Sequence, residues 1–212
     1  MLSKSQQHCL LLDRPRSIAR AALFLDRDGV LIEEKNYLCD PTQVQLLPGA
    51  LPLLKKTFEY GWPVILITNQ SGIARGYFDW DAYERVTNRL IELLGPTAPL
   101  AAIYANGHGP DAPTSSWRKP SPAMLQTAAA DLRLDLGRSL LIGDRLSDLL
   151  AGAHAGLAWL GHVSTGHGER ERPDVEHWIA TMKTPIEQNP TYNVVLLETL
   201  LDFPYDLLRK GT

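Results

Sequence analysis

The sequence has few cysteines, no long hydrophobic run and no excess of positive charge. Of its 212 residues only Cys9 and Cys39 are cysteines, and they form neither a C-x-x-C pair nor a disulfide framework. No apolar run approaches the roughly 18 to 20 residues of a membrane span, and the first twenty residues lack the hydrophobic stretch and cleavage site of a signal peptide. We therefore expect a cytoplasmic protein with no membrane partner.

The formal net charge is −3, which leaves no basic surplus of the kind that nucleic-acid binding requires. We expect no nucleic-acid partner and a small soluble ligand instead. Hydrophobic residues make up 44% of the chain, which is long enough to bury one sizeable core. A single domain and a monomer are expected, although no motif in the sequence reports on oligomeric state.

Short apolar runs of strand length alternate with helical patterns along the chain. Continuous apolar strands indicate burial on both faces, and this alternation predicts a parallel sheet covered by helices on both sides. Functional loops should then lie at the carboxyl ends of the strands. Strands are predicted at 22–25, 64–68, 101–104, 139–143, 157–160 and near 193–197, and helices at 50–60, 79–94 and 121–132.

The predicted fold is α/β: one doubly wound, Rossmann-like domain over residues 21–212, preceded by an N-terminal extension over 1–20. Residues 105–117 are interpreted as a loop, because Gly, Pro, Ser and Thr dominate there. Residues 166–190 are interpreted as a surface insertion near or outside the core, with a flap that shapes a substrate pocket as the alternative. The short gap from Asp28 to Thr68 leaves no room for a large cap domain.

Two carboxylates, Asp26 and Asp28, follow the first buried strand directly and are followed by Gly29. A carboxylate can attack phosphorus and form an aspartyl-phosphate, and a second acid can protonate the leaving oxygen. A turn in which both carboxylates cap neighbouring amides is the alternative, and it would be preferred for an isolated D-x-D-G.

Three further elements match the same chemistry. Thr68 and the residues after it can hold phosphate oxygens, Lys119 can offset negative charge, and Asp144 can ligate Mg²⁺. Taken separately, each element has an ordinary alternative interpretation. Thr68 fits a turn, Lys119 fits a solvated surface lysine, and Asp148, the last residue of the motif that begins with Gly143 and Asp144, fits a helix cap. Four such elements in this order favour phosphoryl transfer.

These motifs resemble those of the haloacid dehalogenase (HAD) superfamily: D-x-D-G, then Thr, then Lys, then G-D-x-x-x-D. Within that superfamily, the chain is similar to the branch of heptose bisphosphate phosphatases and histidinol phosphatases. Four segments carry this similarity: FLDRDGVLIEEKNYL, LITNQSGIARGYF, RKPSPAML and LIGDRLSDLLAG. The resemblance implies Asp26 as nucleophile, Asp28 as acid/base, and Thr68 and Lys119 as phosphoryl stabilisers. Metal ligands are implied at Asp26, at Asp28 through its backbone, and at Asp144, and substrate contacts at Glu34, Lys35, Asn36, Tyr37, Asn69, Gln70, Ser71, Arg118 and Arg145.

The chain departs from this branch at the zinc loop that often precedes R-K-P. The positions corresponding to its ligands are Ala105, Gly107, Ser115 and Trp117, none of which can ligate zinc in that pattern. We predict no structural zinc and expect other contacts, such as packing of Trp117, to hold the loop.

The resemblance implies a Mg²⁺-dependent phosphohydrolase of carbohydrate metabolism that acts through an aspartyl-phosphate on a small phosphorylated metabolite. D-glycero-D-manno-heptose 1,7-bisphosphate is the first candidate substrate and histidinol phosphate the second. A non-catalytic binding protein on the same fold is an alternative of another class. A phosphatase for nucleic-acid ends is a further one, which the acidic balance disfavours.

Overall fold

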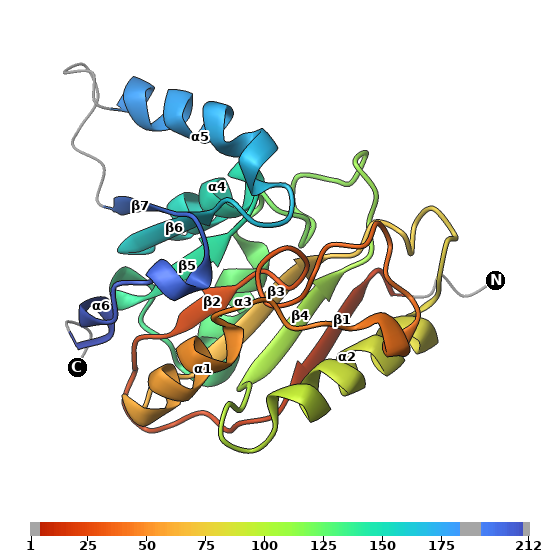
Figure 1. Ribbon diagram of the computed structural model, residues 1–212, viewed down its shortest axis with the longest axis horizontal. Helices are drawn as coiled ribbons and strands as arrows, with labels where there is room; N and C mark the ends of the chain where they lie inside the picture. Colours follow the sequence, from red (N-terminus) through yellow and green to blue (C-terminus); the bar gives the residue numbers. More distant parts are fainter. Residues whose placement is uncertain (1–4, 183–191, 210–212) are drawn as a thin grey trace.

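A seven-stranded sheet forms the centre of the computed structural model, which describes residues 5–182 and 192–209 (Figure 1). Its strand order is β1-β4-β3-β2-β5-β6-β7, parallel except for β1, which pairs antiparallel with β4. The predicted α/β fold is therefore confirmed. The strands are β1 Gln7–Leu11, β2 Leu23–Leu25, β3 Val64–Asn69, β4 Ala102–Asn106, β5 Leu140–Gly143, β6 Trp159–Val163 and β7 Asn193–Leu197.

Helices cover both faces of the sheet, because successive side chains of each apolar strand point to opposite sides. Leu23 and Leu25 of β2 join one core cluster with residues of α1 and α2, whereas Phe24 joins a second with residues of α3, α4 and α5. The helices are α1 Ala50–Glu59, α2 Trp80–Leu94, α3 Ala123–Leu132, α4 Leu146–Ala155, α5 Gly168–Met182 and α6 Asp206–Arg209, with 3-10 turns η1 Pro41–Gln43, η2 Leu136–Arg138 and η3 Leu200–Asp202.

The N-terminal segment contributes a strand to this sheet. Residues 7–11 form β1 on the edge of β4, so the boundary expected at residue 21 does not separate this segment from the domain. The backbone N–H of Gly107, just beyond β4, also donates to the carbonyl of Gln6 at 2.7 Å. The sequence does not predict β1, because this half-exposed edge strand lacks the continuous apolar run that marks the buried strands.

Part of the expected insertion at 166–190 is a crossover helix. Residues 168–182 form α5, which connects β6 to β7 and packs Val175, Trp178 and Ile179 against the second core cluster. Its few apolar positions and its internal Pro173 hide the helical periodicity. The interpretation as a surface insertion is therefore wrong for 168–182, and 183–191 lie outside the described residues.

The strand order places the carboxyl ends of β3, β2 and β5 side by side. The chain runs outward from β2 to β3 and β4, and then crosses back to β5 and β6, which makes β2 and β5 the point where the winding reverses. Among the described residues, only a loop with η1 stands between β2 and α1, and no separate cap domain covers this edge. No helix in the described part of the chain is long and apolar enough to cross a membrane.

Candidate active site

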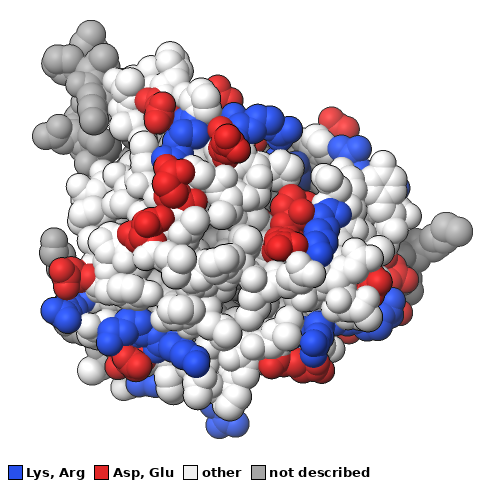
Figure 2. Space-filling model, viewed as in Figure 1, with Lys and Arg blue, Asp and Glu red and all other residues white. Residues whose placement is uncertain are grey.

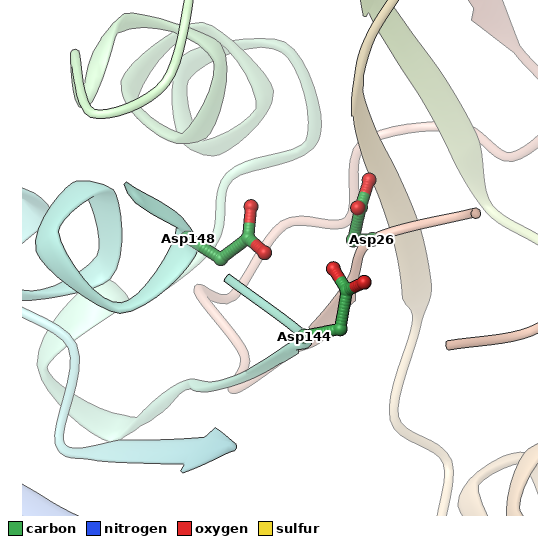
Figure 3. A group of neighbouring side chains, drawn as sticks. All are labelled: Asp26, Asp144 and Asp148. Carbon is green, nitrogen blue, oxygen red and sulfur yellow. The ribbon is translucent and has the colours of Figure 1, made fainter. Parts of the chain in front are cut away.

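Three carboxylates lie together at the carboxyl edge of the sheet (Figure 3). Asp26 follows β2, Asp144 follows β5, and Asp148 lies in the first turn of α4. They are 8%, 0% and 1% exposed, and an oxygen of each lies within 4.8 Å of the other two. Buried negative charges this close are unfavourable unless cations accompany them.

Lys119 supplies one cation to this cluster. Its Nζ lies 2.9 Å from Oδ1 of Asp26 and 2.6 Å from Oδ1 of Asp148, and it donates to the carbonyl of Ile67 at 2.9 Å. Burial opposes the charged ammonium, yet the carboxylates of Asp148 and Asp26 hold the pKa of Lys119 above its usual range. Lys119 is therefore a fixed positive charge beside Asp26.

One lysine leaves the cluster with an excess of negative charge. Burial, reinforced by the Asp26 and Asp148 carboxylates, raises the pKa of Asp144 to about 8. Burial also raises the pKa of Asp26 to about 6, against the opposing effect of Lys119. Asp144 Oδ2 accepts the His167 backbone N–H at 2.7 Å, while Oδ1 is buried without a hydrogen-bond partner. This set of oxygen donors fits a hard divalent cation such as Mg²⁺.

The Asp28 carboxylate lies outside this cluster of three. Gly29, with φ +79°, turns the chain after β2, and the Asp28 carboxylate accepts from the Arg27 guanidinium and from Nε2 of Gln70 at 2.9 Å. The Gln70 amide also donates to the Thr68 hydroxyl at 2.8 Å. The two aspartates of the D-x-D-G motif thus have separate surroundings, as a nucleophile and an acid require.

Arg27 is a residue of this site that the sequence analysis missed. Its side chain is 1% exposed, and its guanidinium lies over the Tyr83 ring at 5.3 Å from the ring centroid. The available signal was a charged residue directly after a fully buried strand, since buried arginines are paired. The helix-cap interpretation of Asp148 is observed, since its Oδ2 accepts the Arg145 backbone N–H at 3.0 Å, but its Oδ1 also pairs with Lys119.

Asn69, at the end of β3, fixes the backbone of Lys119. Its Oδ1 accepts the Lys119 N–H at 3.2 Å and its Nδ2 donates to the Lys119 carbonyl at 3.3 Å. Neighbouring strand ends thereby align the lysine with Asp26.

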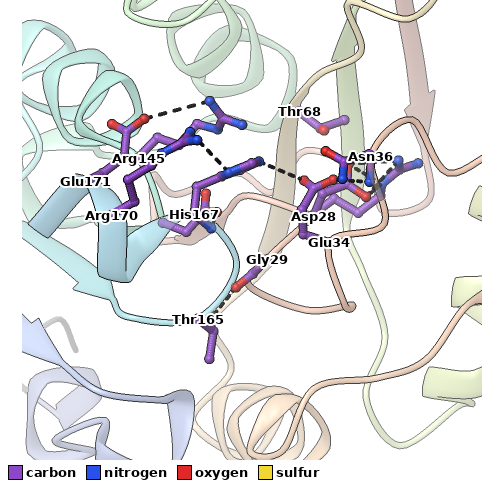
Figure 4. A network of polar contacts seen from close by, with 12 residues as sticks. Asp28, Gly29, Glu34, Asn36, Thr68, Arg145, Thr165, His167, Arg170 and Glu171 are labelled. Carbon is purple, nitrogen blue, oxygen red and sulfur yellow. Dashed lines mark hydrogen bonds and ion pairs between the residues drawn. The ribbon is translucent and has the colours of Figure 1, made fainter.

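A cavity of about 270 Å³ opens beside Asp28. Seven of the predicted substrate residues line it: Glu34, Asn36, Tyr37, Asn69, Gln70, Ser71 and Arg145. Lys35 and Arg118 do not; Lys35 pairs with Glu33 at 3.4 Å, and Arg118 donates to the carbonyl of His108 at 3.1 Å. His167 lines the cavity but was not predicted as a site residue (Figure 4).

The loop at 105–117 is held by side-chain and backbone contacts. His108 Nδ1 lies 3.0 Å from Oδ1 of Asn106, and the Trp117 ring packs edge-on against Tyr104 with centroids 5.5 Å apart. The packing of Trp117 expected from the sequence is therefore observed.

Comparison with known proteins places this geometry in a family. A 7-phosphatase for D-glycero-β-D-manno-heptose 1,7-bisphosphate from Mesorhizobium japonicum is 44% identical over 163 residues, covering 72% of this chain and 75% of the relative. The corresponding enzyme of Thermosynechococcus vestitus is 39% identical over 162 residues, covering 71% and 82%. The chain belongs to the heptose-bisphosphate 7-phosphatase family. It is therefore a phosphoric monoester hydrolase of the HAD type, and the resemblance seen in the sequence is confirmed.

Family and structural matches agree with this assignment. The family described as HAD-hydrolase-like matches residues 116–194. A protein from Mesorhizobium loti described as a HAD-like phosphatase superposes with a TM-score of 0.78 at 33% identity, covering 98% of this chain and 94% of that one. The D,D-heptose 1,7-bisphosphate phosphatase of B. bronchiseptica, crystallised with magnesium and phosphate, gives 0.72 at 31% identity, covering 90% and 99%.

Proposed function

We propose that this member of the heptose-bisphosphate 7-phosphatase family acts in the cytoplasm on a sugar bisphosphate of carbohydrate metabolism, with D-glycero-D-manno-heptose 1,7-bisphosphate as the first candidate. One observation carries the mechanism: Asp26 lies buried against Lys119 and beside Asp144, while Asp28 turns into a separate, cavity-lining position. A nucleophile and a proton donor held apart in this way can act on the two sides of one phosphorus–oxygen bond.

In the first step, an oxygen of Asp26 attacks phosphorus and the bond to the sugar oxygen breaks. Asp28, in its acid form, gives its proton to that oxygen, so the sugar leaves as an alcohol. In the second step, Asp28 takes a proton from water as the water oxygen attacks the aspartyl-phosphate, which releases phosphate and restores Asp26.

Lys119 and the Thr68 hydroxyl contact the transferring phosphoryl group and offset its charge. Mg²⁺ would be held by Asp26 and Asp144, with Asp148 beside them and the Asp28 carbonyl as the further ligand implied by the family resemblance, and when bound it supplies charge neutralisation for the phosphoryl oxygens. The oxygen-only donor set and the unpaired Oδ1 of Asp144 support that choice.

Positive charge near the cavity supports a bisphosphate. Arg145 lines the cavity, and burial together with the guanidinium groups of Arg145 and Arg75 lowers the pKa of Arg118. Three guanidinium groups within electrostatic reach of one another attract a second phosphate and repel an amine. Histidinol, whose amine is cationic, is therefore the less favoured leaving group.

On the face shown in Figure 2, acidic and basic side chains are interspersed and form no broad basic surface. This face therefore gives no support to the alternative of a phosphatase that acts on nucleic-acid ends. The intact catalytic residues likewise disfavour a non-catalytic binding protein.

The test is phosphate release by the purified protein with Mg²⁺ from both anomers of the heptose bisphosphate, histidinol phosphate and a 5′-phosphorylated oligonucleotide. We expect fastest turnover on one heptose anomer and none by Asp26→Asn. Faster release from histidinol phosphate or the oligonucleotide would contradict the substrate, and turnover of no substrate would favour the binding protein.

A further inference from the structure

The loop between β6 and α5 lies against the D-x-D-G turn. The Thr165 hydroxyl donates to the Gly29 carbonyl at 2.6 Å (Figure 4). Gly166 has φ +62°, and a Cβ there would lie 2.5 Å from Gly29 Cα and collide with the Asp144 carboxylate. Because contacts this close leave no space for a side chain, the loop is fixed to the catalytic turn.

His167, the next residue, connects two parts of the site. Its backbone N–H donates to Asp144 Oδ2 at 2.7 Å, within the carboxylate cluster. Its imidazole points the other way, with Nε2 3.5 Å from Oε2 of Glu34 and Nδ1 3.4 Å from an Arg170 guanidinium nitrogen (Figure 4). Backbone and side chain of one residue therefore have different tasks.

Glu34 is held in position to face this imidazole. Its Oε1 accepts the Asn36 backbone N–H at 2.7 Å, in a loop whose Asn36 and Tyr37 both have positive φ. Such backbone strain in residues other than glycine is kept where the local geometry has a function. The side chains of His167 and Glu34 are 20% and 21% exposed, and both line the cavity beside Asp28.

We propose that His167 is a specificity-determining residue that, together with Glu34, hydrogen-bonds the hydroxyl groups of the leaving polyol. This assignment rests on the proposed function. The imidazole N–H is a donor and the Glu34 carboxylate an acceptor, so the pair matches a hydroxyl or two adjacent hydroxyls. A partly buried polar pair of this kind selects substrates with hydroxyl groups, because an apolar leaving group displaces water from it and offers no hydrogen bond in exchange.

The test compares two substrates that share the phosphoryl site. The heptose bisphosphate reaches the His167–Glu34 pair, whereas 4-nitrophenyl phosphate has no hydroxyl for it. For His167→Ala we expect a loss in kcat/KM of about tenfold on the sugar, mainly through KM, corresponding to one lost hydrogen bond. On 4-nitrophenyl phosphate we expect less than about a twofold change, because the backbone N–H to Asp144 remains.

Four further variants complete the experiment: His167→Gln, His177→Ala, Glu34→Gln, and Glu34→Gln combined with His167→Ala. His167→Gln retains a donor and should recover part of the sugar affinity, whereas His177→Ala, at an exposed position of α5, should change the kinetics on neither substrate. Adding Glu34→Gln to His167→Ala should cost less than the sum of the two single losses, because they share one contact.

Equal losses on both substrates would overturn the assignment and make His167 a support for Asp144 alone. An unchanged sugar KM would also overturn it. If the wild-type protein hydrolyses 4-nitrophenyl phosphate but not the heptose bisphosphate, the proposed substrate is wrong, and this assignment with it. If the wild type hydrolyses the heptose bisphosphate and His167→Ala does so with the same kcat/KM, only the role of His167 is wrong.

Discussion

The Arg27 guanidinium contacts both carboxylate oxygens of Asp28, through Nε and Nη2, at 2.8 to 3.2 Å. Because Arg27 is buried and also donates to Oε1 of Gln70 at 3.1 Å, it fixes the direction of the Asp28 side chain. In the proposed mechanism, this contact aligns the acid with the leaving oxygen before the reaction begins.

Replacement of Arg27 by Met should therefore lower kcat more than it changes KM. We expect a loss of about 10- to 100-fold, because a displaced acid protonates the leaving group poorly. Steady-state kinetics on the sugar substrate measure this, with Arg85→Met at an exposed position of α2 as the control. Full activity of Arg27→Met would show that Asp28 needs no such support.

Lys119→Met should destabilise the metal-free protein by about 3 to 5 kcal/mol, since it leaves buried carboxylates without their cation. Activity should disappear as well. Adding Asp148→Asn removes one of those charges and should restore part of the stability but none of the activity. Chemical denaturation and phosphate release measure the two effects, and a double variant no more stable than Lys119→Met would contradict the charge argument.

The metal-free protein should lose stability as pH rises from 5 to 8.5. Burial raises the pKa of Asp144 to about 8, so the folded state binds more protons than the unfolded state between about pH 4 and pH 8. A carboxyl group with a raised pKa stabilises the fold below its unfolded pKa, and this contribution is lost as pH rises through the folded pKa.

Melting temperatures in a chelator follow this loss, and Asp144→Asn should flatten the curve. Mg²⁺ should raise the melting temperature more at pH 8.5 than at pH 5, because it binds the ionised cluster. A flat curve for the metal-free wild type, or an equally steep one for Asp144→Asn, is the result that would count against Asp144.

Gly166→Ala should cost both stability and activity, and Gly156→Ala is its matched control. Both glycines have positive φ, +62° and +78°, so both substitutions introduce similar backbone strain of about 1 kcal/mol. Around Gly156 a Cβ meets no atom within 4 Å, whereas at Gly166 it collides with Asp144 and Gly29. Only Gly166→Ala should reduce phosphate release, and equal effects would show that the close packing is unimportant.

The sequence predicted those parts of the site that follow buried apolar strands. Each of these runs ends at a site residue: Asp26, Thr68 or Asp144. Neighbouring parallel strands bring their carboxyl ends together regardless of the conformation of the loops. Lys119 was predicted from its position before a helix.

The position of His167 could not be predicted in this way. It depends on the close packing of Gly166 against Gly29, and residues far apart in sequence leave no periodic signal of such a contact. The strand β1 and the helix α5 were missed for a related reason, since each exposes so much of its surface that its apolar pattern is thin.

The hydrogen bond between Gln6 and Gly107 has a practical consequence for handling the protein. It fastens the start of the loop at 105–117, whose far end leads to Lys119, to the residue just before the edge strand β1. A purification tag fused ahead of residue 5 would pull on the segment that is hydrogen-bonded to this loop. Kinetic work on this phosphatase should use protein from which such a tag has been cleaved.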